Sequence, residues 1–308
     1  RPRVLFVGGT YPGYIALDTL FKIGANLVGI VPIREAPYEL KPYYPLIQEF
    51  AQERGIYLSE ANLSSKRLKE VVEITHPDIL FCTGYRRLIS SDVLQLIPLA
   101  AVGTHFSLLP KYRGFAPVNW AIINGETETG VSLFHLTEEV DAGDIIVQRR
   151  IPIGPDDTAS QVLERCTETL ALILREVFPL IEKGMAPRIA QPSVGATYTC
   201  PRTPLDGIID WSKTSKEIHN MVRALAAPFP GARTTLDGRP IIVWKTRLLH
   251  DFPNYIGRIP GRVVEICDEG VKVLTGDSGL LVIEVGTDET TCMPAYSVIR
   301  SIRMTLGR

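Results

Sequence analysis

The sequence lacks the features of a membrane protein or a nucleic-acid-binding protein. No apolar run reaches about 18 residues, the length that a membrane-spanning helix needs. Positive and negative charges are balanced, 33 Lys and Arg against 34 Asp and Glu, which gives a formal net charge of −1. Because phosphate binding depends on a local excess of Lys and Arg, nucleic acid is not an expected partner. The apolar stretch at the N-terminus is too short for a secretory signal, so we expect a first strand there.

Cysteine and histidine are scarce, with five of each. The cysteines are odd in number, lie far apart and form no C-x-x-C pair, which argues against a disulfide framework and a zinc site. They are Cys82, Cys166, Cys200, Cys267 and Cys292. We expect them to be small buried hydrophobes of a cytoplasmic protein. The histidines form no H-E-x-x-H motif, so no metal is expected.

What the sequence does contain is a regular alternation of strand and helix patterns. A length of 308 residues suggests roughly two domains. Strand patterns lie at 4–7, 27–31, 79–82, 100–104, 131–136 and 145–151, and helix patterns at 44–54, 66–74 and 90–96. This alternation predicts an α/β fold, with a doubly wound, mainly parallel Rossmann-like sheet in a catalytic domain over residues 1–190.

The second half changes character. A long apolar-striped helix opens at Asp156-Asp157-Thr158, and the periodicity then fades. Residues 191–205 are rich in Pro, Ser and Thr and are expected to form a linker. After one helix over 216–226, short strand patterns separated by turn residues predict a small OB-like β-barrel domain over 206–308.

Ligands of doubly wound sheets bind outside the carboxyl ends of the strands. The first such segment, Gly8 to Gly13, invites comparison with a nucleotide-binding loop. Its order is G-G-x-x-x-G, however, and Pro12 lacks the backbone N–H that a phosphate loop needs. We therefore expect a tight turn at the rim of an active site, with Gly9 and Thr10 among the substrate-binding residues.

The most informative stretch is HFSLLPKYRG, from His105 to Gly114, together with DAGDI, which begins at Asp141. Further characteristic segments lie at 77–79, 85–89, 117–131, 202–204, 210–211, 219–224 and 228–232. In these segments the chain resembles the folate-dependent formyltransferase family, and among its members most closely the enzymes that formylate amino sugars. The resemblance spans nearly the whole chain.

The resemblance implies transfer of a formyl group from 10-formyltetrahydrofolate to an amine through a tetrahedral oxyanion. Such a reaction needs a donor for the oxyanion and a group that manages protons. A histidine suits both tasks because its ordinary pKa lies near neutrality. By resemblance, His105 polarises the formyl oxygen and stabilises the oxyanion, while Asp141 orients His105 and assists deprotonation of the amine through water.

One position departs from the family pattern. The family usually carries Asn two residues before the histidine, where this chain has Gly103. Loss of an oxyanion donor can lower the rate by roughly 10²–10³. A backbone N–H, Thr104 or another side chain could take over, and we expect an active enzyme with a rearranged oxyanion hole. The alternative is a non-catalytic, folate-binding homologue.

The resemblance also implies binding residues. The pterin of the donor is expected against the backbone of residues 85–89, with apolar walls from Leu88 and Ile89. The expected donor-binding residues are Tyr85, Arg86, Arg87, Leu88, Ile89 and Asp144. The basic turn Lys111-Tyr112-Arg113 is expected either to contact an anionic substrate or only to close its loop. Ser107 also belongs to the expected substrate site, although no G-x-S-x-G elbow marks it as a nucleophile, and a turn hydrogen bond is its other role.

The acceptor is expected to be the amine of a nucleotide-linked amino sugar. A tRNA-specific enzyme would favour a basic insertion after the second strand, yet residues 34–41 carry two positive and two negative charges. Methionyl-tRNA or a peptide amine is the alternative acceptor. Since the chain ends at Arg308, we expect a separate enzyme to make the amine. A homodimer through the C-terminal domain is compatible with the pattern.

Overall fold

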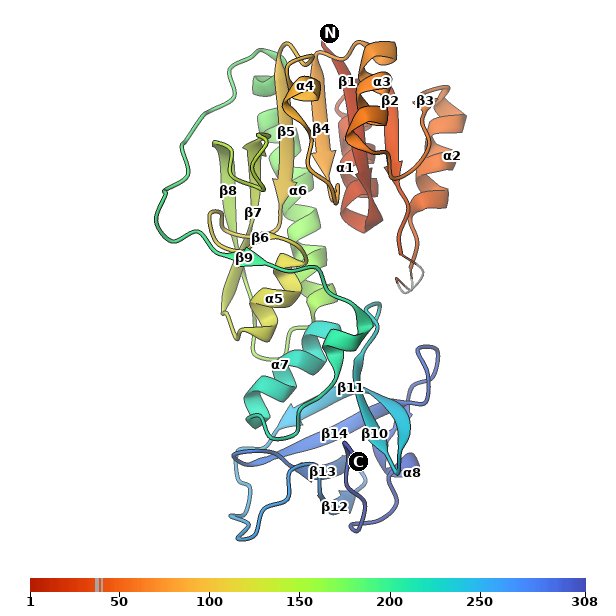
Figure 1. Cartoon of the computed structure of the whole chain (residues 1–308), viewed down its shortest axis with the longest axis vertical. Helices are drawn as coiled ribbons and strands as arrows, with labels where there is room; N and C mark the ends of the chain where they lie inside the picture. Colours follow the sequence, from red (N-terminus) through yellow and green to blue (C-terminus); the bar gives the residue numbers. More distant parts are fainter. Residues whose placement is uncertain (37–38, 40) are drawn as a thin grey trace.

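The computed structural model describes residues 1–36, 39 and 41–308, and consists of a helix-flanked sheet followed by an antiparallel sheet (Figure 1). The first sheet has seven strands in the order β3-β2-β1-β4-β5-β7-β8. These strands are β1 (Arg3–Gly9), β2 (Asn26–Ile33), β3 (Tyr57–Leu58), β4 (Ile79–Thr83), β5 (Ala100–His105), β7 (Glu128–His135) and β8 (Ile145–Pro152). The strands β1 to β5 pair in parallel, whereas β7 pairs antiparallel with both β5 and β8. The predicted mainly parallel sheet is confirmed, with an antiparallel edge.

Helices cover both faces of this sheet. They are α1 (Thr10–Lys22), α2 (Tyr44–Arg54), α3 (Ser65–Thr75), α4 (Ser91–Leu94), α5 (Pro117–Ile123) and α6 (Ala159–Glu182). In β1, Val4 and Phe6 face one apolar cluster while Leu5 and Val7 face the other. A central strand buried on both faces explains why its sequence is a continuous apolar run without alternation. Helix α4 is shorter than the expected 90–96, although Ser90 does precede it.

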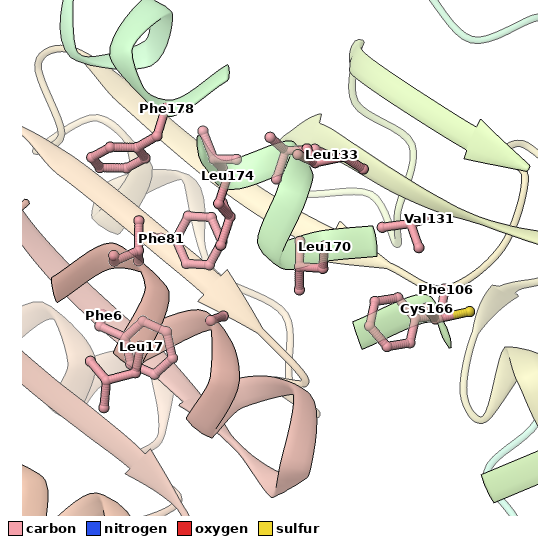
Figure 2. Close-up of a cluster of buried hydrophobic side chains, with 14 of the residues drawn as sticks. Phe6, Leu17, Phe81, Phe106, Val131, Leu133, Cys166, Leu170, Leu174 and Phe178 are labelled. Carbon is pink, nitrogen blue, oxygen red and sulfur yellow. The ribbon is translucent and has the colours of Figure 1, made fainter. Parts of the chain in front are cut away.

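The larger cluster lies between the sheet and helices α1 and α6 (Figure 2). Phe6 and Phe81 stack with ring centroids 6.1 Å apart, and Phe178 of α6 is fully buried. Each such side chain contributes roughly 1.5–3 kcal/mol through burial. Phe106, at the end of β5, belongs to the same cluster and therefore fixes the backbone beside His105.

The C-terminal sheet has the order β10-β11-β14-β13-β12, with β15 paired to β14. Its strands are β10 (Ala232–Leu236), β11 (Arg239–Leu248), β12 (Val263–Cys267), β13 (Gly270–Leu274), β14 (Gly279–Gly286) and β15 (Met293–Pro294). Thr305 bridges to Arg262 next to β12, and Leu306 bridges to Leu236 of β10, so the chain end links the two edges of the sheet. The expected C-terminal β domain is thus an antiparallel sheet closed by its last residues.

Short elements connect and complete the two sheets. They are β6 (Arg113–Gly114), β9 (Tyr198–Thr199), the 3₁₀ turn η1 (Pro204–Gly207), α7 (Ser215–Leu225) and α8 (Ala295–Val298). Thr214 caps α7 reciprocally with Glu217, as Thr158 caps α6 with Gln161. Helix α7 packs against α5 on one side and β11 on the other, and so ties the two sheets together (Figure 1).

The cysteines are only partly as expected. Cys82 and Cys166 are buried, and burial raises the pKa of each thiol to about 12, which keeps it protonated. Cys200 and Cys292 are exposed, so the expectation of burial is wrong for these two, which lie outside the hydrophobic clusters. In the described part of the chain, no group of three or more His, Cys, Asp or Glu could hold a metal ion. No helix among the described residues is both long and apolar enough to cross a membrane.

Two buried histidines make stability depend on pH. Burial lowers the pKa of His135 and His219, and for His219 nearby Arg223 lowers it further while Asp156 opposes the shift. Each imidazole is neutral when folded and takes up a proton on unfolding, so the unfolded state binds more protons below about pH 6.5. We expect the free energy of unfolding to fall as the pH drops through that range.

Urea unfolding at about pH 7.5 and about pH 5.5 measures this dependence. The variant His219→Gln cannot titrate and should lose less stability between the two pH values than the wild type. An equal loss of stability in both proteins would show that His219 does not contribute to the pH dependence of unfolding.

Candidate active site

His105 is the last residue of β5 and is 7% exposed. Its Nε2 lies 2.6 Å from the backbone oxygen of Tyr112, and its Nδ1 lies 3.4 Å from Oδ2 of Asp141. A carbonyl oxygen only accepts hydrogen bonds, so Nε2 carries a proton and donates a hydrogen bond to the Tyr112 carbonyl. The two residues that the sequence assigned to catalysis are therefore adjacent.

Asp141 lies in the loop between β7 and β8 and adopts a left-handed backbone conformation, with φ of 49°. Its Oδ2 accepts a hydrogen bond of 2.8 Å from the backbone N–H of Gly114, while Oδ1 has no hydrogen-bond partner among the described residues. A Cβ added to Gly143 would lie 1.7 Å from the backbone oxygen of His135. Only glycine allows this close approach, so the loop that carries Asp141 needs a glycine at position 143.

Residues 191–205, which are expected to form a linker, connect the two sheets, and their first half also makes specific contacts with the loop after His105. The segment 191–199 lies across the catalytic loop, where β9 pairs in parallel with β6. The backbone of Arg113 donates to Thr197, and the backbone of Tyr112 donates to the Thr197 hydroxyl over 2.8 Å. The polar composition that suggested a linker also supplies hydrogen bonds to the loop after His105.

Gln191 joins the two loops that carry His105 and Asp141. Its Oε1 accepts from Nε and Nη2 of Arg113, at 3.2 and 2.6 Å. Its Nε2 donates to the backbone oxygens of Asp141 and Gly143, both at 2.8 Å. No sequence pattern indicates this role, because Gln191 is far from both motifs along the chain and is recognised only by its contacts.

Arg113 is buried, and its guanidinium is bonded within the protein. It donates to Gln191 through Nε and Nη2 and, through Nη1, to the Tyr198 hydroxyl at 3.0 Å. The structure thus gives Arg113 the loop-closing role rather than an exposed position for an anionic substrate, because the side chain is buried and all three of its nitrogens are bonded. Ser107 likewise donates to the backbone oxygen of Lys111 over 2.6 Å, which is the turn role.

The remaining members of the expected substrate set are placed differently. The Tyr112 hydroxyl donates to Glu126 over 2.8 Å, and burial raises the pKa of this phenol. Lys111 is exposed and forms no ion pair within the described residues. Gly9 ends β1, and Thr10 follows it with a φ of 61° and lines the cavity described below.

The space beside Gly103 is filled by hydrophobic side chains. Antiparallel pairing of β5 with β7 sets Gly103 directly opposite Phe134. A Cβ on Gly103 would lie 2.7 Å from Leu136 Cδ2 and 3.0 Å from Phe134 Cζ. Thr104, one of the expected alternative donors, donates its hydroxyl to Thr83 over 2.7 Å and would have to exchange this bond to serve an oxyanion.

This packing predicts the result of restoring the family's asparagine. Gly103→Asn alone should destabilise the fold by roughly 1–3 kcal/mol, because the new side chain meets Phe134 and Leu136. Combined with Phe134→Leu, which makes room, it should raise the single-turnover formyl-transfer rate by about tenfold or more over Phe134→Leu alone. Thermal unfolding and rapid-quench kinetics on the three variants measure both effects; an unchanged rate in the folded double variant would show that this position supplies no oxyanion donor.

The expected donor-binding segment follows β4. Arg86 forms an ion pair with Glu39 at 2.7 Å, Arg87 is exposed, and Leu88 is 54% exposed. Ile89, by contrast, is buried in the cluster beneath the sheet, so its expected role as an apolar wall is wrong. The Tyr85 hydroxyl donates to the backbone oxygen of Leu63, so this side chain is bonded within the protein. Any contact of Tyr85 with a ligand would then involve its backbone. Asp144 lies apart from it, 3.8 Å from Arg188.

A cavity of about 900 Å³ is lined in part by residues that are chain neighbours of the His105–Asp141 pair and its contacts. Phe106 follows His105, and Phe115 follows Gly114, whose N–H donates to Asp141. One wall comes from residues 10–12 and Arg86, at the carboxyl ends of β1 and β4. The other comes from residues 201–204 and 227–230, which lead into the C-terminal sheet. A cavity of this size is in the range of small-molecule and cofactor sites.

Comparison with known proteins agrees with this architecture. Residues 24–177 match the family model described as formyl transferase, and residues 202–303 match that of the formyl transferase C-terminal domain. The N-formyltransferase of Helicobacter canadensis, solved with folinic acid and dTDP-3-aminofucose, is 20% identical with a TM-score of 0.69, covering 92% of this chain and 99% of the relative.

Two further solved structures are similar. WlaRD, a sugar 3N-formyl transferase solved with dTDP and 5-N-formyl-THF, is 20% identical with a TM-score of 0.67, covering 91% of this chain and 96% of that one. HypX of Aquifex aeolicus, solved with tetrahydrofolic acid, is 19% identical with a TM-score of 0.65, and the match covers 98% of this chain but 47% of HypX. At these identities the likeness establishes the fold.

Proposed function

This chain belongs to the formyl transferase family, and from that premise we propose that it transfers the formyl group of 10-formyltetrahydrofolate to the amino group of a nucleotide-linked amino sugar. The observation that carries the proposal is the contact of His105 with Asp141, next to Phe106, which lines the 900 Å³ cavity. The alternative, a non-catalytic folate-binding homologue, is disfavoured because both proton-managing side chains are present and adjacent.

The chemistry requires one bond to form and one to break. The amine nitrogen attacks the formyl carbon, the carbonyl oxygen becomes an oxyanion, and the bond from carbon to N10 of the folate then breaks. The amine loses a proton and N10 gains one. His105 Nε2 donates to the oxyanion after exchanging its bond to the Tyr112 carbonyl for one to the substrate.

Asp141 completes the proton transfers. Oδ2 is held by the Gly114 N–H and faces His105, so the carboxylate keeps a fixed orientation. Oδ1 remains available to accept a proton from the attacking amine, directly or through water. The side chain is 21% exposed, which allows a water molecule to reach it.

The binding of the two substrates follows from the walls of the cavity. The folate donor fits against the backbone of residues 85–89, where the exposed Leu88 offers an apolar surface. The amino-sugar acceptor fits the wall formed by residues 201–204 and 227–230. The likeness to structures solved with folates and with dTDP or a dTDP-linked amino sugar supports this assignment.

A mass-spectrometric screen tests the proposal. The protein is incubated with 10-formyltetrahydrofolate and a panel of nucleotide-linked amino sugars, with methionyl-tRNA and a peptide amine in parallel arms. We expect a mass gain of one formyl group on at least one amino sugar and none on the tRNA or peptide. Formylation of the tRNA alone would replace the proposed acceptor, and donor binding with no product in any arm would support a non-catalytic homologue.

A further inference from the structure

Arg202 is an arginine of the cavity wall that the mechanism does not use. It lies between β9 and η1, and its guanidinium carbon lies 4.6 Å from the centroid of the Trp120 ring. The ring is held in turn, because Trp120 Nε1 donates to the backbone oxygen of Cys200 over 2.9 Å. Stacking on a fixed aromatic ring gives the guanidinium a defined orientation at the cavity.

The charge of Arg202 has no carboxylate partner among the described residues. Its Nη2 donates to the backbone oxygen of Asp206 over 2.8 Å, and its Nη1 has no acceptor in the described part of the chain. The Asp206 carboxylate instead accepts from the backbone N–H and the hydroxyl of Thr203, at 2.6 and 3.0 Å. Burial lowers the pKa of Arg202, and the nearby charge of Asp206 opposes this shift.

Two other arginines near the cavity have partners within the protein. Arg86 is paired with Glu39 at 2.7 Å. Arg223 donates to Asn220 and to the backbone oxygens of Gly154 and Asp157. Of the two arginines that line the cavity, Arg86 is thus paired with a carboxylate and Arg202 is not, so the charge of Arg202 can receive an anion from the cavity. A planar guanidinium suits phosphate and carboxylate oxygens, and phosphate is the anionic group of a nucleotide-linked acceptor.

We propose that Arg202, oriented by Trp120, binds the phosphate of the acceptor substrate. The proposal deepens the proposed function and rests on it for the identity of the acceptor. Arg202 belongs to the wall formed by the segment leading to the C-terminal sheet, whereas Arg86, of the expected donor segment, lies in the opposite wall after the carboxyl end of β4. This placement assigns the phosphate to the acceptor and leaves the carboxylates of the folate tail to other groups.

Calorimetric titration of the full chain with dTDP, UDP and inorganic pyrophosphate tests the site without any transfer reaction. Arg202→Met keeps an apolar side chain on Trp120 and removes the charge, and Arg202→Lys keeps the charge without the planar fork. Arg303→Met, at an exposed position whose guanidinium makes no hydrogen bond within the described residues, is the matched control. We expect Arg202→Met to weaken binding of the nucleoside diphosphates by about 10- to 100-fold, Arg202→Lys by less, and the control not at all.

Steady-state kinetics then distinguishes an effect on acceptor binding from an effect on donor binding. The KM for the amino-sugar nucleotide should rise by a similar factor in Arg202→Met, with the KM for the folate donor unchanged. A raised donor KM with unchanged nucleotide affinity, or no binding of either nucleoside diphosphate to the wild type, would overturn the proposal. Binding that depends on Arg202 in a protein that formylates no amine would uphold this phosphate site and contradict the proposed function.

Discussion

Replacing His105 by Asn is expected to lower the single-turnover rate of formyl transfer by roughly 10²–10⁴. The change removes the group proposed to donate to the oxyanion, which faces Asp141 across 3.4 Å. The side chain amide of Asn can still donate to the Tyr112 carbonyl, so the loop should keep its position. Rapid-quench measurement with saturating donor and acceptor gives the rate of the chemical step.

The matched control is His76→Asn. His76 is exposed at the end of α3 and has a left-handed backbone, with φ of 41°, a conformation that Asn tolerates well. This variant should transfer formyl groups at the wild-type rate. If His105→Asn also kept the wild-type rate while remaining folded, His105 would have no part in the chemistry.

Gln191→Leu is expected to lower kcat by about 10²-fold with little change in the KM for either substrate. Gln191 touches no substrate in the proposed mechanism, so it is a positioning residue. Its four hydrogen bonds fix Arg113 of one loop against Asp141 and Gly143 of the other. Leu has a similar size but makes none of them, and a small shift of Asp141 relative to His105 is enough to slow proton transfer.

Gln191→Glu separates the hydrogen bonds that Gln191 accepts from those that it donates. The carboxylate still accepts from Arg113 but cannot donate to the backbone oxygens of Asp141 and Gly143. We expect a kcat loss close to that of Leu together with a changed pH profile of kcat, since the environment of Asp141 changes. Gln52→Leu, on the exposed side of α2, is the control and should have no effect. If kcat fell in Gln191→Leu but stayed at the wild-type value in Gln191→Glu, the effect would come from the bonds to Arg113 alone.

Much of the fold could be predicted from hydrophobic periodicity. Helix α2 has the predicted limits, and the strands at 79–82 and 100–104 extend by one residue each to Thr83 and His105. Continuous apolar runs such as residues 4–7 indicate strands buried on both faces, and this burial is what the sheet provides. The family motifs then led to His105 and Asp141, which the fold brings into contact.

The errors share one physical origin, because they concern contacts between segments distant in sequence. Nothing near Gly103 along the chain indicates that Phe134 lies opposite it, since this depends on the register of β7 against β5. Arg113 reads as a cation of a basic turn, and its burial depends on Gln191 and Tyr198 from a segment that composition describes as a linker. Ile89 was chosen by position in a motif, whereas its side chain follows the packing beneath the sheet.

In the proposed reaction, a formyl group passes from folate to an amine at the His105–Asp141 pair. Single-turnover transfer of a ¹³C-labelled formyl group from 10-formyltetrahydrofolate to a nucleotide-linked amino sugar tests this, comparing wild type with Asp141→Asn. We expect a labelled formamide with the wild type and a rate lower by roughly 10²-fold or more in the variant. Equal rates in the two proteins, or no labelled product from the wild type with any acceptor of the panel, would contradict the proposed reaction.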